Sequence, residues 1–470
     1  MTIDQTNNGD GASTPLLQAD DRSGSVPDPV DGSVGRVVVV GAGISGLTAA
    51  RALQLSGVDV VVLEGRERTG GRTHTVDVGG AAVDLGGSWI HDGAGSPMLP
   101  YVDALGIERL PAPPSGIVLG AAVVNRTDGA DGTYPDQDAR ESLTGALAGF
   151  VLSRDAIADL PPKLSLEAAM DELIPIIDPN IRPHLAAMLA MYEGEDAADL
   201  ALGTFASFFF SGGVEDQDVL PSGGYRRVVE HLADGLNIHV GTAVERIEQR
   251  DGEVTVHTSA GPFSGTHAIV TIPLGVLKAG SVAFEPPLPE RHQEAVDRMG
   301  FGAFEKVALA YERPVWQVDG VPTHLTVVDQ GRTRWPVVLD MSAWYGTPVI
   351  VGMAIGEWAR ELAGIAEADR VDALHDVIRA IAGPDTPRPI GWSTTNWSTD
   401  PFLLGCYTSF DMDSDPEQQA EDVAALATPH GRVLFAGEHT STAGTSTVDS
   451  AWLTGVREAS RLLQRSQVPL

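Results

Sequence analysis

Short apolar runs bounded by turn residues recur along this chain, and the first two have the clearest context. Residues 37–40 are four consecutive valines, residues 60–63 form a second apolar run, and the residues between them have the composition of a helix. An apolar run of this length is typical of a strand buried on both faces of a parallel sheet. The order strand, helix, strand therefore predicts a βαβ unit and an α/β fold.

The turn after the first strand carries glycines at a spacing that suits a dinucleotide. It reads Gly41-Ala42-Gly43-Ile44-Ser45-Gly46. Gly41 allows a tight turn, Gly43 lets the backbone approach a pyrophosphate, and Gly46 lets the helix pack close to the sheet. The helix that begins at Ile44 and Ser45 would direct its free N–H groups at the phosphates. A turn in an ordinary α/β domain is the alternative, but the strand before the turn, the helix after it and the acid described next all agree with a dinucleotide site.

An acid and a second glycine turn follow. Glu64 ends the second strand, at about the twenty-residue spacing expected of an acid that binds ribose hydroxyls. Gly65 and Arg66 come next, and a glycine pair then ends in Gly71-Arg72. This second turn resembles the flavin-binding form of the unit, in which the arginine lies near the pyrophosphate and flavin. Simple nicotinamide dehydrogenases do not usually have it.

Further along, both kinds of periodicity appear. Apolar residues at helical spacing predict that 141–210 is mostly helical, and they predict later helices at 369–382 and from about 450, the last ending as an amphipathic surface helix over 457–465. Other apolar runs predict strands at 83–85, 238–240, 244–247, 254–258, 268–272, 307–311, 348–354 and 432–436.

At 470 residues the chain is too long for one compact core. We expect a discontinuous Rossmann-like nucleotide-binding domain with an inserted α+β domain made of a mixed sheet plus helices. We assign residues 35–95, 220–290 and 390–470 to the first domain, and residues 96–219 and 291–389 to the second. Residues 1–34 are rich in Asp, Asn, Gly, Ser, Thr and Pro, so we expect a disordered acidic tail.

Charge and cysteine content exclude some classes of function. The formal net charge of −33 disfavours nucleic acid as a partner and repels anionic membranes. It would attract cationic small molecules, or it serves solubility alone. The single cysteine, Cys406, rules out an intramolecular disulfide and fits a reducing compartment. No apolar run approaches a membrane span or a secretion signal, so we expect a cytoplasmic protein. A homodimer is one option for its assembly, and we assign no metal site.

Blocks of sequence from about residue 35 to 465 resemble the flavin-containing amine oxidases, which include monoamine oxidases, polyamine oxidases and lysine-specific histone demethylases. Beside the opening unit, the blocks are 87–91, 221–232, 273–278, 284–289, 300–307 and 435–440. Polyamine oxidases are the most similar branch. The resemblance implies FAD in the first domain and a small-molecule amine in the second. Its reaction oxidises a carbon–nitrogen bond of a primary or secondary amine to an imine, which hydrolyses to an aldehyde and an amine, while O2 becomes H2O2.

The resemblance also implies roles for three residues in catalysis. Lys306 matches the family lysine that holds a water against the flavin, and a lysine in an apolar run is costly to bury unpaired. The alternative is a strand-edge lysine that reaches solvent. His91 matches a histidine near the substrate amine in polyamine oxidases, or it is a structural histidine bonded to the backbone. Tyr407 matches one wall of an aromatic cage around the substrate nitrogen.

Two positions separate the branches of the family. Thr447 stands where monoamine oxidases have the second tyrosine of the cage, which favours a polyamine oxidase and a wider substrate. Cys406 stands where monoamine oxidases bond covalently to the flavin. A covalent link through Cys406 and a buried, unreactive thiol both stay open.

The remaining residues that the resemblance assigns to the cofactor or substrate are spread along the chain. Glu438 would close the second half of the cofactor site, and the helix that starts at Val448 would point its N-terminus at the flavin. Trp397 would pack against the flavin or belong to an ordinary core. The other cofactor contacts are Gly87, Ser88, Trp89, Val244 and Gly437.

Five acids lie where substrate reaches the site in the family, so they could bind a distal ammonium, or they form a solvated face: Glu193, Glu195, Asp196, Glu215 and Asp216. Phe209 would wall a channel or lie in the core. The leading hypothesis is a polyamine-oxidase-like enzyme. A monoamine oxidase or a tailoring oxidase of an aromatic amine is the second, and a binding protein that kept the fold without the chemistry is the third.

Overall fold

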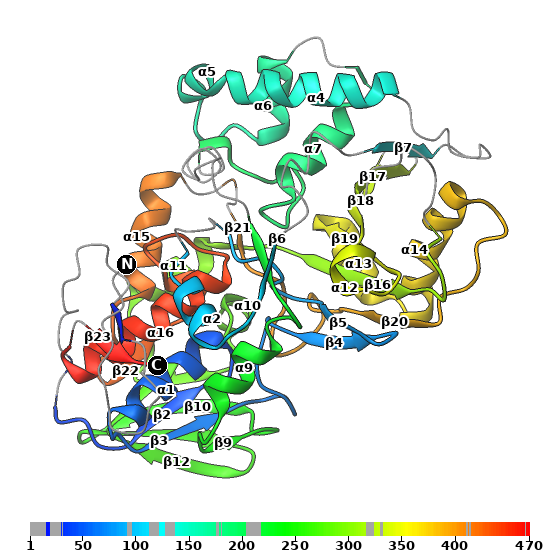
Figure 1. Ribbon diagram of the computed structural model, residues 1–470. Coiled ribbons are helices and arrows are strands. Elements are labelled where there is room, and N and C mark those ends of the chain that lie inside the picture. The colour runs from blue at the N-terminus through cyan, green and yellow to red at the C-terminus, as the bar shows by residue number, and fades with distance from the viewer. Residues whose placement is uncertain are drawn as a thin grey trace.

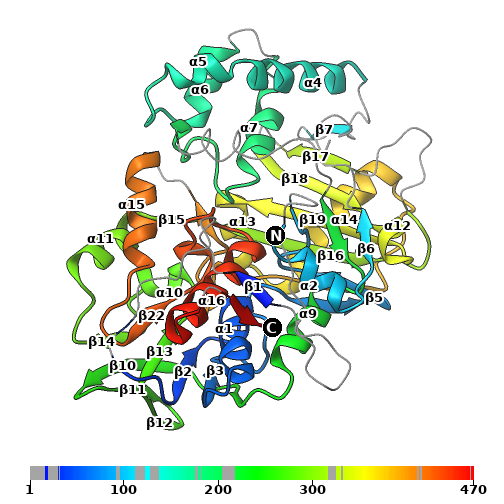
Figure 2. The ribbon, with the colours of Figure 1, turned by 60° about the vertical axis from the view of Figure 1, so that its left-hand side comes forward.

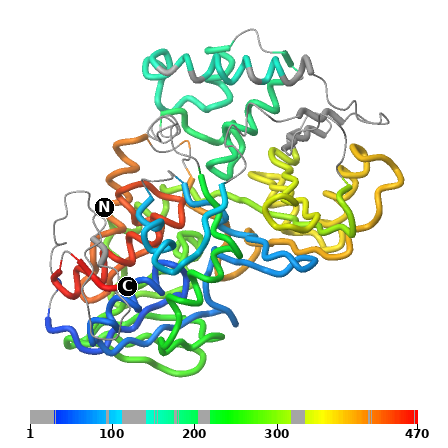
Figure 3. The backbone as a smooth tube through the Cα atoms, in the orientation of Figure 1, coloured from blue at the N-terminus to red at the C-terminus, as the bar shows by residue number. Residues whose placement is uncertain are grey.

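The computed structural model describes residues 16–18, 30, 32–91, 96–111, 122–126, 137–174, 178–179, 181–203, 218–315, 324–329, 332–409, 412, 415–465 and 467–470. Three regions can be followed in Figure 1. A nucleotide-binding region lies at the bottom, a second sheet with its helices lies at the right, and a group of helices lies at the top. In the tube of Figure 3, the blue, green and red segments come together in the bottom region, so it is assembled from distant parts of the chain.

A five-stranded parallel sheet forms the centre of the nucleotide-binding region. Its order is β22-β13-β2-β3-β9, and every neighbouring pair is parallel. The two valine-rich strands are fully buried, as their uninterrupted apolar runs predicted. The strands are β2 (Val37–Val40), β3 (Val60–Leu63), β9 (Ile238–His239), β13 (His267–Val270) and β22 (Val433–Phe435).

The two faces of this sheet are covered by different layers. One face carries helices α1 (Ile44–Leu55), α9 (Arg226–Ala233) and α16 (Val448–Leu463). The other face packs on a sheet of order β12-β11-β10-β14. Those strands are β10 (Val244–Arg250), β11 (Glu253–Thr258), β12 (Gly261–Gly265) and β14 (Ala283–Glu285).

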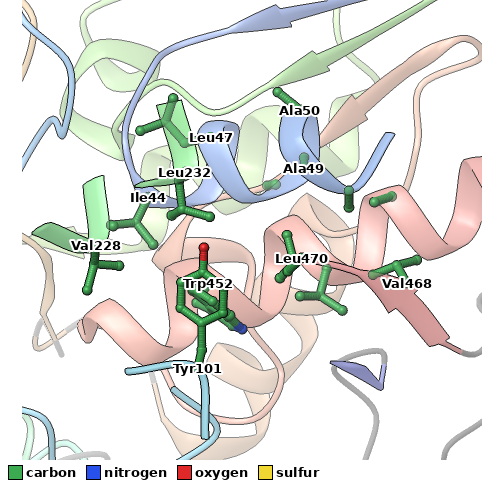
Figure 4. Packing of buried hydrophobic residues seen from close by; sticks show 14 of the residues in the cluster. Ile44, Leu47, Ala49, Ala50, Tyr101, Val228, Leu232, Trp452, Val468 and Leu470 are labelled. Atoms are coloured by element: carbon green, nitrogen blue, oxygen red, sulfur yellow. The ribbon is translucent and has the colours of Figure 1, made fainter. Parts of the chain in front are cut away.

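Helices α1 and α16 lie side by side (Figure 4). Trp452 of α16 packs in the same core against Tyr101, which comes from the short helix α2 (Leu99–Ala104). The two rings meet edge to face, with centroids 4.5 Å apart. A Cβ at Gly455 would lie 2.4 Å from the Ser45 carbonyl oxygen, so only glycine permits this approach. The helices bring the N-terminal and C-terminal ends of the described chain into one core.

The prediction of an amphipathic surface helix at the C-terminal end is wrong. The charged residues Arg457, Glu458 and Arg461 are buried. Arg461 Nε donates to Glu458 Oε2 at 2.8 Å, and Arg457 Nη1 donates to the Thr440 carbonyl at 2.6 Å. These charges are paired and bonded to backbone inside the protein, an arrangement that helical periodicity cannot distinguish from a solvated face.

The second region is a mostly antiparallel sheet of order β20-β16-β19-β18-β17-β7, in which only the β17–β7 pair is parallel. Helices α13 (Gly356–Gly364) and α14 (Glu367–Ala382) pack against it. The strands are β7 (Ala122–Arg126), β16 (Phe304–Ala310), β17 (His324–Asp329), β18 (Arg332–Asp340), β19 (Val349–Ile355) and β20 (Gly391–Thr394).

The top region is a small helical cluster with its own apolar core. Its helices are α4 (Gln137–Leu152), α5 (Arg154–Ala158), α6 (Leu166–Leu173) and α7 (Arg182–Ala190). They confirm the helical prediction for this part of the chain. Residues 204–217, including Phe209, lie outside the described residues.

Short elements join the regions. The pairs β4 (Thr75–Val78) with β5 (Ala81–Asp84), β6 (Arg109–Pro111) with β8 (Val219–Pro221), and β15 (Gly300–Phe301) with β21 (Thr408–Ser409) form two-stranded sheets. The short helices are α2 (Leu99–Ala104), α10 (Leu274–Lys278), α11 (Glu290–Arg298), α12 (Ser342–Tyr345), α15 (Pro416–Leu426) and η2 (Glu438–Thr440).

Three of the helices and strands pack with a different region from the one to which we assigned their residues. Helix α2 lies in the same core as α1, so the nucleotide-binding region continues past residue 95. Helix α11 packs with α10 and α15 rather than with the second sheet. Strand β20 pairs with β16 and therefore belongs to the second sheet, although it follows residue 390. These pairings join segments that are distant in sequence, which composition alone does not reveal.

Part of the N-terminal segment is ordered as well. β1 (Leu16–Gln18) pairs antiparallel with β23 (Gln467–Pro469), and Figure 2 shows β1 beside the red C-terminal strand. These three residues differ from the expected disordered tail. Among the described helices, none combines the length and the apolar character needed to cross a membrane.

Candidate active site

Two glycine turns meet at the N-terminus of α1. Gly43 forms a β-bridge with Gly70, whose N–H donates to the Ala42 carbonyl at 2.8 Å, and a Cβ at Gly71 would lie 3.2 Å from Gly43 Cα. Gly43 caps α1 without a side chain, and a Cβ built on it meets nothing within 4 Å. The first-turn N–H groups therefore face open space, a setting that suits an anionic pyrophosphate.

The other glycines of the first turn serve close packing. Gly41 has a φ of +105°, which favours glycine. A Cβ at Gly46 would lie 2.0 Å from the Gly41 carbonyl oxygen, so the helix can start directly behind the turn only with glycine there. Ile44 and Ser45 form the buried first turn of α1. The structure thus brings together the residues that the glycine spacing predicted.

Glu64 lies beneath this turn and is buried. Its Oε2 accepts from Ala42 N at 2.8 Å, and its Oε1 accepts from Arg66 N at 2.9 Å. Each carboxylate oxygen keeps a lone pair for a hydroxyl donor. Thr242 N donates to the Glu64 carbonyl at 2.8 Å, two residues before Val244, the first residue of β10. This donor and acceptor set fits the adenosine and pyrophosphate of FAD.

The same turn is tied to the segment that carries Cys406. Arg66 Nη2 pairs with Asp400 Oδ2 at 2.8 Å. A Cβ at Gly65 would lie 2.5 Å from the Phe402 ring. Residues 400–407 therefore lie against the nucleotide turn, although more than three hundred residues separate them in sequence.

Arg72 links the glycine turn to Glu438. Its Nη1 donates to Glu438 Oε1 at 2.8 Å and to the Cys406 carbonyl at 2.7 Å. Burial acts to raise the pKa of Glu438, but the Arg72 charge and the hydrogen bonds to the carboxylate outweigh burial, and the pKa is lowered. Thr408 Oγ1 also donates to Glu438, at 2.9 Å. Glu438 is therefore a buried, fully ionised acid held by a cation.

Helix α16 begins beside these groups. Thr447 is its N-cap, and Thr447 Oγ1 accepts from Ser450 N at 3.0 Å. A Cβ at Gly87 would lie 2.5 Å from Val448 Cγ2, and Gly87 N donates to the Arg72 carbonyl at 3.1 Å. Gly437, with a φ of +128°, precedes η2 next to the same helix. The hydroxyl of Thr447 is thus engaged in capping rather than free to line a cage.

Lys306 is buried on β16, which lies between β19 and β20, so it does not reach solvent at a strand edge. Its Nζ donates to the Gly86 carbonyl at 2.7 Å and to Ser88 Oγ at 2.7 Å, and it lies 5.0 Å from the centre of the Trp89 ring. Burial lowers the pKa of Lys306 to about 8, and the charge of Asp84 opposes that shift. The turn that we expected to contact the cofactor therefore also holds this amine.

Two buried acids that support the site escaped prediction. Asp84 accepts from Tyr225 N at 3.2 Å, and burial raises the pKa of Asp84 to about 6. Glu305 accepts from Trp397 N at 3.0 Å and so anchors the loop that carries Trp397. The Trp397 ring packs on Gly86. Each acid stands in an apolar strand immediately beside a recognised motif. A charged residue in such a run is the signal that would have revealed them.

His91 pairs with an acid rather than with backbone. His91 Nδ1 lies 3.0 Å from Asp218 Oδ2, and the His91 side chain is half exposed. Desolvation acts to lower the pKa of His91, but the hydrogen bond and charge of Asp218 outweigh it and raise that pKa. Asp218 carried no sequence signal, because it is separated from His91 by more than a hundred residues.

Cys406 and Tyr407 face the loop that follows α7. The Cys406 thiol is buried, and burial raises its pKa well above the usual range. Tyr407 OH donates to the Met191 carbonyl at 3.2 Å. A Cβ at Gly194 would lie 3.0 Å from Cys406 Sγ and 3.4 Å from the Tyr407 ring. The loop over 191–196 therefore closes one side of the site.

Glu193 lies in this loop and is buried, with only 1% of the residue exposed. Its Oε1 has no hydrogen-bond partner among the described residues. Burial raises the pKa of Glu193 to about 8. Of the other acids expected near it, Glu195 is paired with Arg360. Glu215 and Asp216 lie outside the described residues. Within the described part of the chain, no three His, Cys, Asp or Glu side chains are grouped to hold a metal ion.

Comparisons with known proteins agree with this geometry. Residues 44–463 match the family described as flavin containing amine oxidoreductase. Polyamine oxidase 2 of Arabidopsis thaliana is 30% identical over 468 residues, which cover 91% of this chain and 89% of that protein. Protein FLOWERING LOCUS D of Arabidopsis thaliana is 30% identical over 469 residues, which cover 93% of this chain and 56% of that protein.

The chain spans a little over half the length of FLOWERING LOCUS D and of the lysine-specific histone demethylase 1 homologues that it matches. The solved structure of wild-type putrescine oxidase bound to putrescine has a TM-score of 0.73 at 21% identity, over 92% of this chain and 99% of that one. That likeness supports the fold. The family match covers residues 44–463, and this chain therefore belongs to the family of flavin-containing amine oxidoreductases.

Proposed function

We propose that this chain is an FAD-dependent oxidase of linear di- or polyamines. The observation that carries the proposal is Glu193, a buried carboxyl group with an unpartnered oxygen, close enough to Tyr407 for its charge to act on the phenol. A buried acid without a partner is costly unless it is neutral or a cation reaches it. The second ammonium of a diamine supplies that cation, whereas a monoamine has none.

The surroundings support a cationic substrate. The raised pKa keeps Glu193 protonated at neutral pH in the empty site, and an arriving ammonium favours its ionised form. The net charge of −33 draws polycations toward the protein before they bind. Polyamine oxidases and putrescine oxidase stand among its relatives and structural neighbours.

The residues of the chain divide the work. Bound FAD would supply the redox chemistry, which is the removal of two electrons from the carbon next to the amine nitrogen and their transfer to O2. Glu193 holds the distal ammonium, and Tyr407 packs beside the nitrogen that reacts. Lys306 Nζ, fixed by Gly86 and Ser88, presents a buried amine that holds a water and can exchange a proton. The imine then leaves to be hydrolysed.

The test is a peroxide-coupled assay of purified yellow protein, with putrescine, spermidine, spermine, their acetylated forms, tyramine and benzylamine side by side. Peroxide from the linear amines supports the proposal. Turnover of the aromatic amines alone would favour the second candidate, an oxidase of aromatic monoamines, which rests on Cys406 in the string Gly405-Cys406-Tyr407-Thr408. A methylated-lysine peptide adds the substrate class named by the demethylase relatives. Protein that binds no flavin would favour a non-catalytic role.

Glu193→Gln tests the ammonium site directly. Loss of a charge-assisted hydrogen bond of about 1.5–3 kcal/mol is expected to raise KM for putrescine by about 10- to 100-fold. KM for butylamine, which has no second ammonium, should change by less than about 2-fold. Glu172→Gln, an exposed acid on α6, is the matched control and should leave both values unchanged. Equal effects of Glu193→Gln on the two substrates would contradict the assignment.

We further propose that FAD is bound without a covalent link to Cys406. The thiol is buried, and its pKa is raised, so the thiolate needed for attachment is disfavoured. Precipitation with acid is expected to release the yellow colour into the supernatant for wild type and for Cys406→Ala alike. Colour that stays with the wild-type precipitate and is released from Cys406→Ala would establish the covalent bond instead.

A further inference from the structure

The loop that carries Glu193 is held in place by backbone contacts on both sides. Glu193 N donates to the Ala190 carbonyl at 3.0 Å, at the end of α7. The Gly194 carbonyl accepts from Ala303 N at 2.7 Å and from Gly356 N at 3.3 Å. Gly356 is the first residue of α13, so the loop is attached to the start of that helix.

Asp196 makes a side-chain contact between the loop and the first turn of α13. Asp196 Oδ2 accepts from Glu357 N at 2.9 Å. The N-cap residue of α13 is Ile355, whose side chain makes no capping hydrogen bond. Asp196 therefore supplies the cap from another segment, and its negative charge lies at the positive end of the helix dipole.

Gly356 makes room for this cap. Its φ is +57°, and a Cβ built on it would lie 2.5 Å from Asp196 Oδ2. Any larger residue would both strain the backbone and displace the carboxylate. The other contact, between Glu195 and Arg360, involves an arginine whose side chain is 47% exposed, so it holds the loop less firmly.

We propose that Asp196 is a positioning residue that, by capping α13, fixes Glu193 in the site and so sets the preference for diamines over monoamines. This inference rests on the proposed function, since it needs Glu193 to bind the distal ammonium. Asp196 itself does not touch the substrate. Its effect passes through the two residues of backbone that separate it from Glu193.

Steady-state kinetics of the FAD-loaded full chain test this role with putrescine and butylamine. Asp196→Ala removes the cap of α13 and is expected to raise KM for putrescine by about 3- to 30-fold. Values of kcat, and KM for butylamine, should stay within about 2-fold. Asp196→Asn keeps an oxygen that can accept from Glu357 N, so it should restore most of the lost affinity. Gly356→Ala, which displaces the carboxylate, should reproduce the pattern of Asp196→Ala.

Each outcome decides between the two claims. If Glu193→Gln raises KM for putrescine but Asp196→Ala and Gly356→Ala do not, the positioning role is wrong and the proposed function stands. If Asp196→Ala raises KM for both amines equally, the residue is merely structural and the role is again wrong. If the wild-type protein oxidises no diamine, the proposed function fails and the inference fails with it.

Discussion

Lys306→Met is expected to lower kcat for putrescine by about 10²-fold or more, the usual contribution of a positioned proton-transfer group. Methionine keeps the length and apolar stem of the side chain on β16 but removes the amine that Gly86 and Ser88 hold. Stopped-flow absorbance, with anaerobic reduction and oxygen-dependent reoxidation followed separately, would show which half of the cycle needs the amine. Lys163→Met, at an exposed lysine, is the control and should leave both halves unchanged.

The pH dependence gives this variant a second readout. The pKa of Lys306 is lowered from 10.5 to about 8 by burial, so the stability contributed by a neutral amine is fully present above about pH 10.5 and is lost as pH falls from there to about 8. Lys306→Met should lack that loss. The kcat profile of the wild type should also inflect near pH 8, and the variant should not. An unchanged profile, or a kcat within about 3-fold of wild type, would remove Lys306 from the catalytic residues.

Arg72→Met is expected to abolish FAD retention and to destabilise the protein by about 3–5 kcal/mol, because it leaves the buried Glu438 without its cation. The flavin-to-protein absorbance ratio after desalting measures the first effect, and thermal unfolding of the flavin-free proteins measures the second. The control is Arg36→Met, which breaks an ion pair that is more than half exposed on both sides and should have almost no effect.

The direction of the pH effect distinguishes a lost ion pair from general disruption. In the wild type the pKa of Glu438 is lowered, so its contribution to stability is present above its unfolded-state pKa and is lost as pH falls. In Arg72→Met the main attraction is lost, so burial acts against the hydrogen bonds from Thr408 and Ser446 alone, and the pKa of Glu438 is expected to rise. The difference in melting temperature between the two proteins should therefore shrink toward pH 5. A difference that is constant from pH 5 to 8 would contradict the ion-pair explanation.

The parts of the site that sequence predicted are those built from neighbouring residues. The turn from Gly41 to Gly46 and the acid Glu64 are recognisable because each glycine has a local geometric duty and the βαβ unit supplies the spacing. Lys306 was recognisable by resemblance, and burial of a lone lysine in an apolar strand gave a physical reason to single it out.

The contacts that sequence could not predict join residues far apart in the chain. Asp218 with His91, Glu305 with Trp397, and Asp196 with the start of α13 have no fixed spacing, since they exist only once the strands are in register. The error at the C-terminal helix has a related cause. Charges at helical spacing look alike whether water or a buried carbonyl such as that of Thr440 receives them.

The packing of α16 against α1 also governs when this protein can acquire its cofactor during synthesis. The first glycine turn leaves the ribosome early, but its helix needs Trp452 and Gly455 as neighbours, and Arg72 needs Glu438. Both partners are translated only after the whole second sheet and the helical cluster have emerged. A nascent chain stopped before residue 438 therefore contains the glycine turn of the flavin site but lacks Glu438 and α16, which complete that site. We expect FAD to bind only after α16 has been translated.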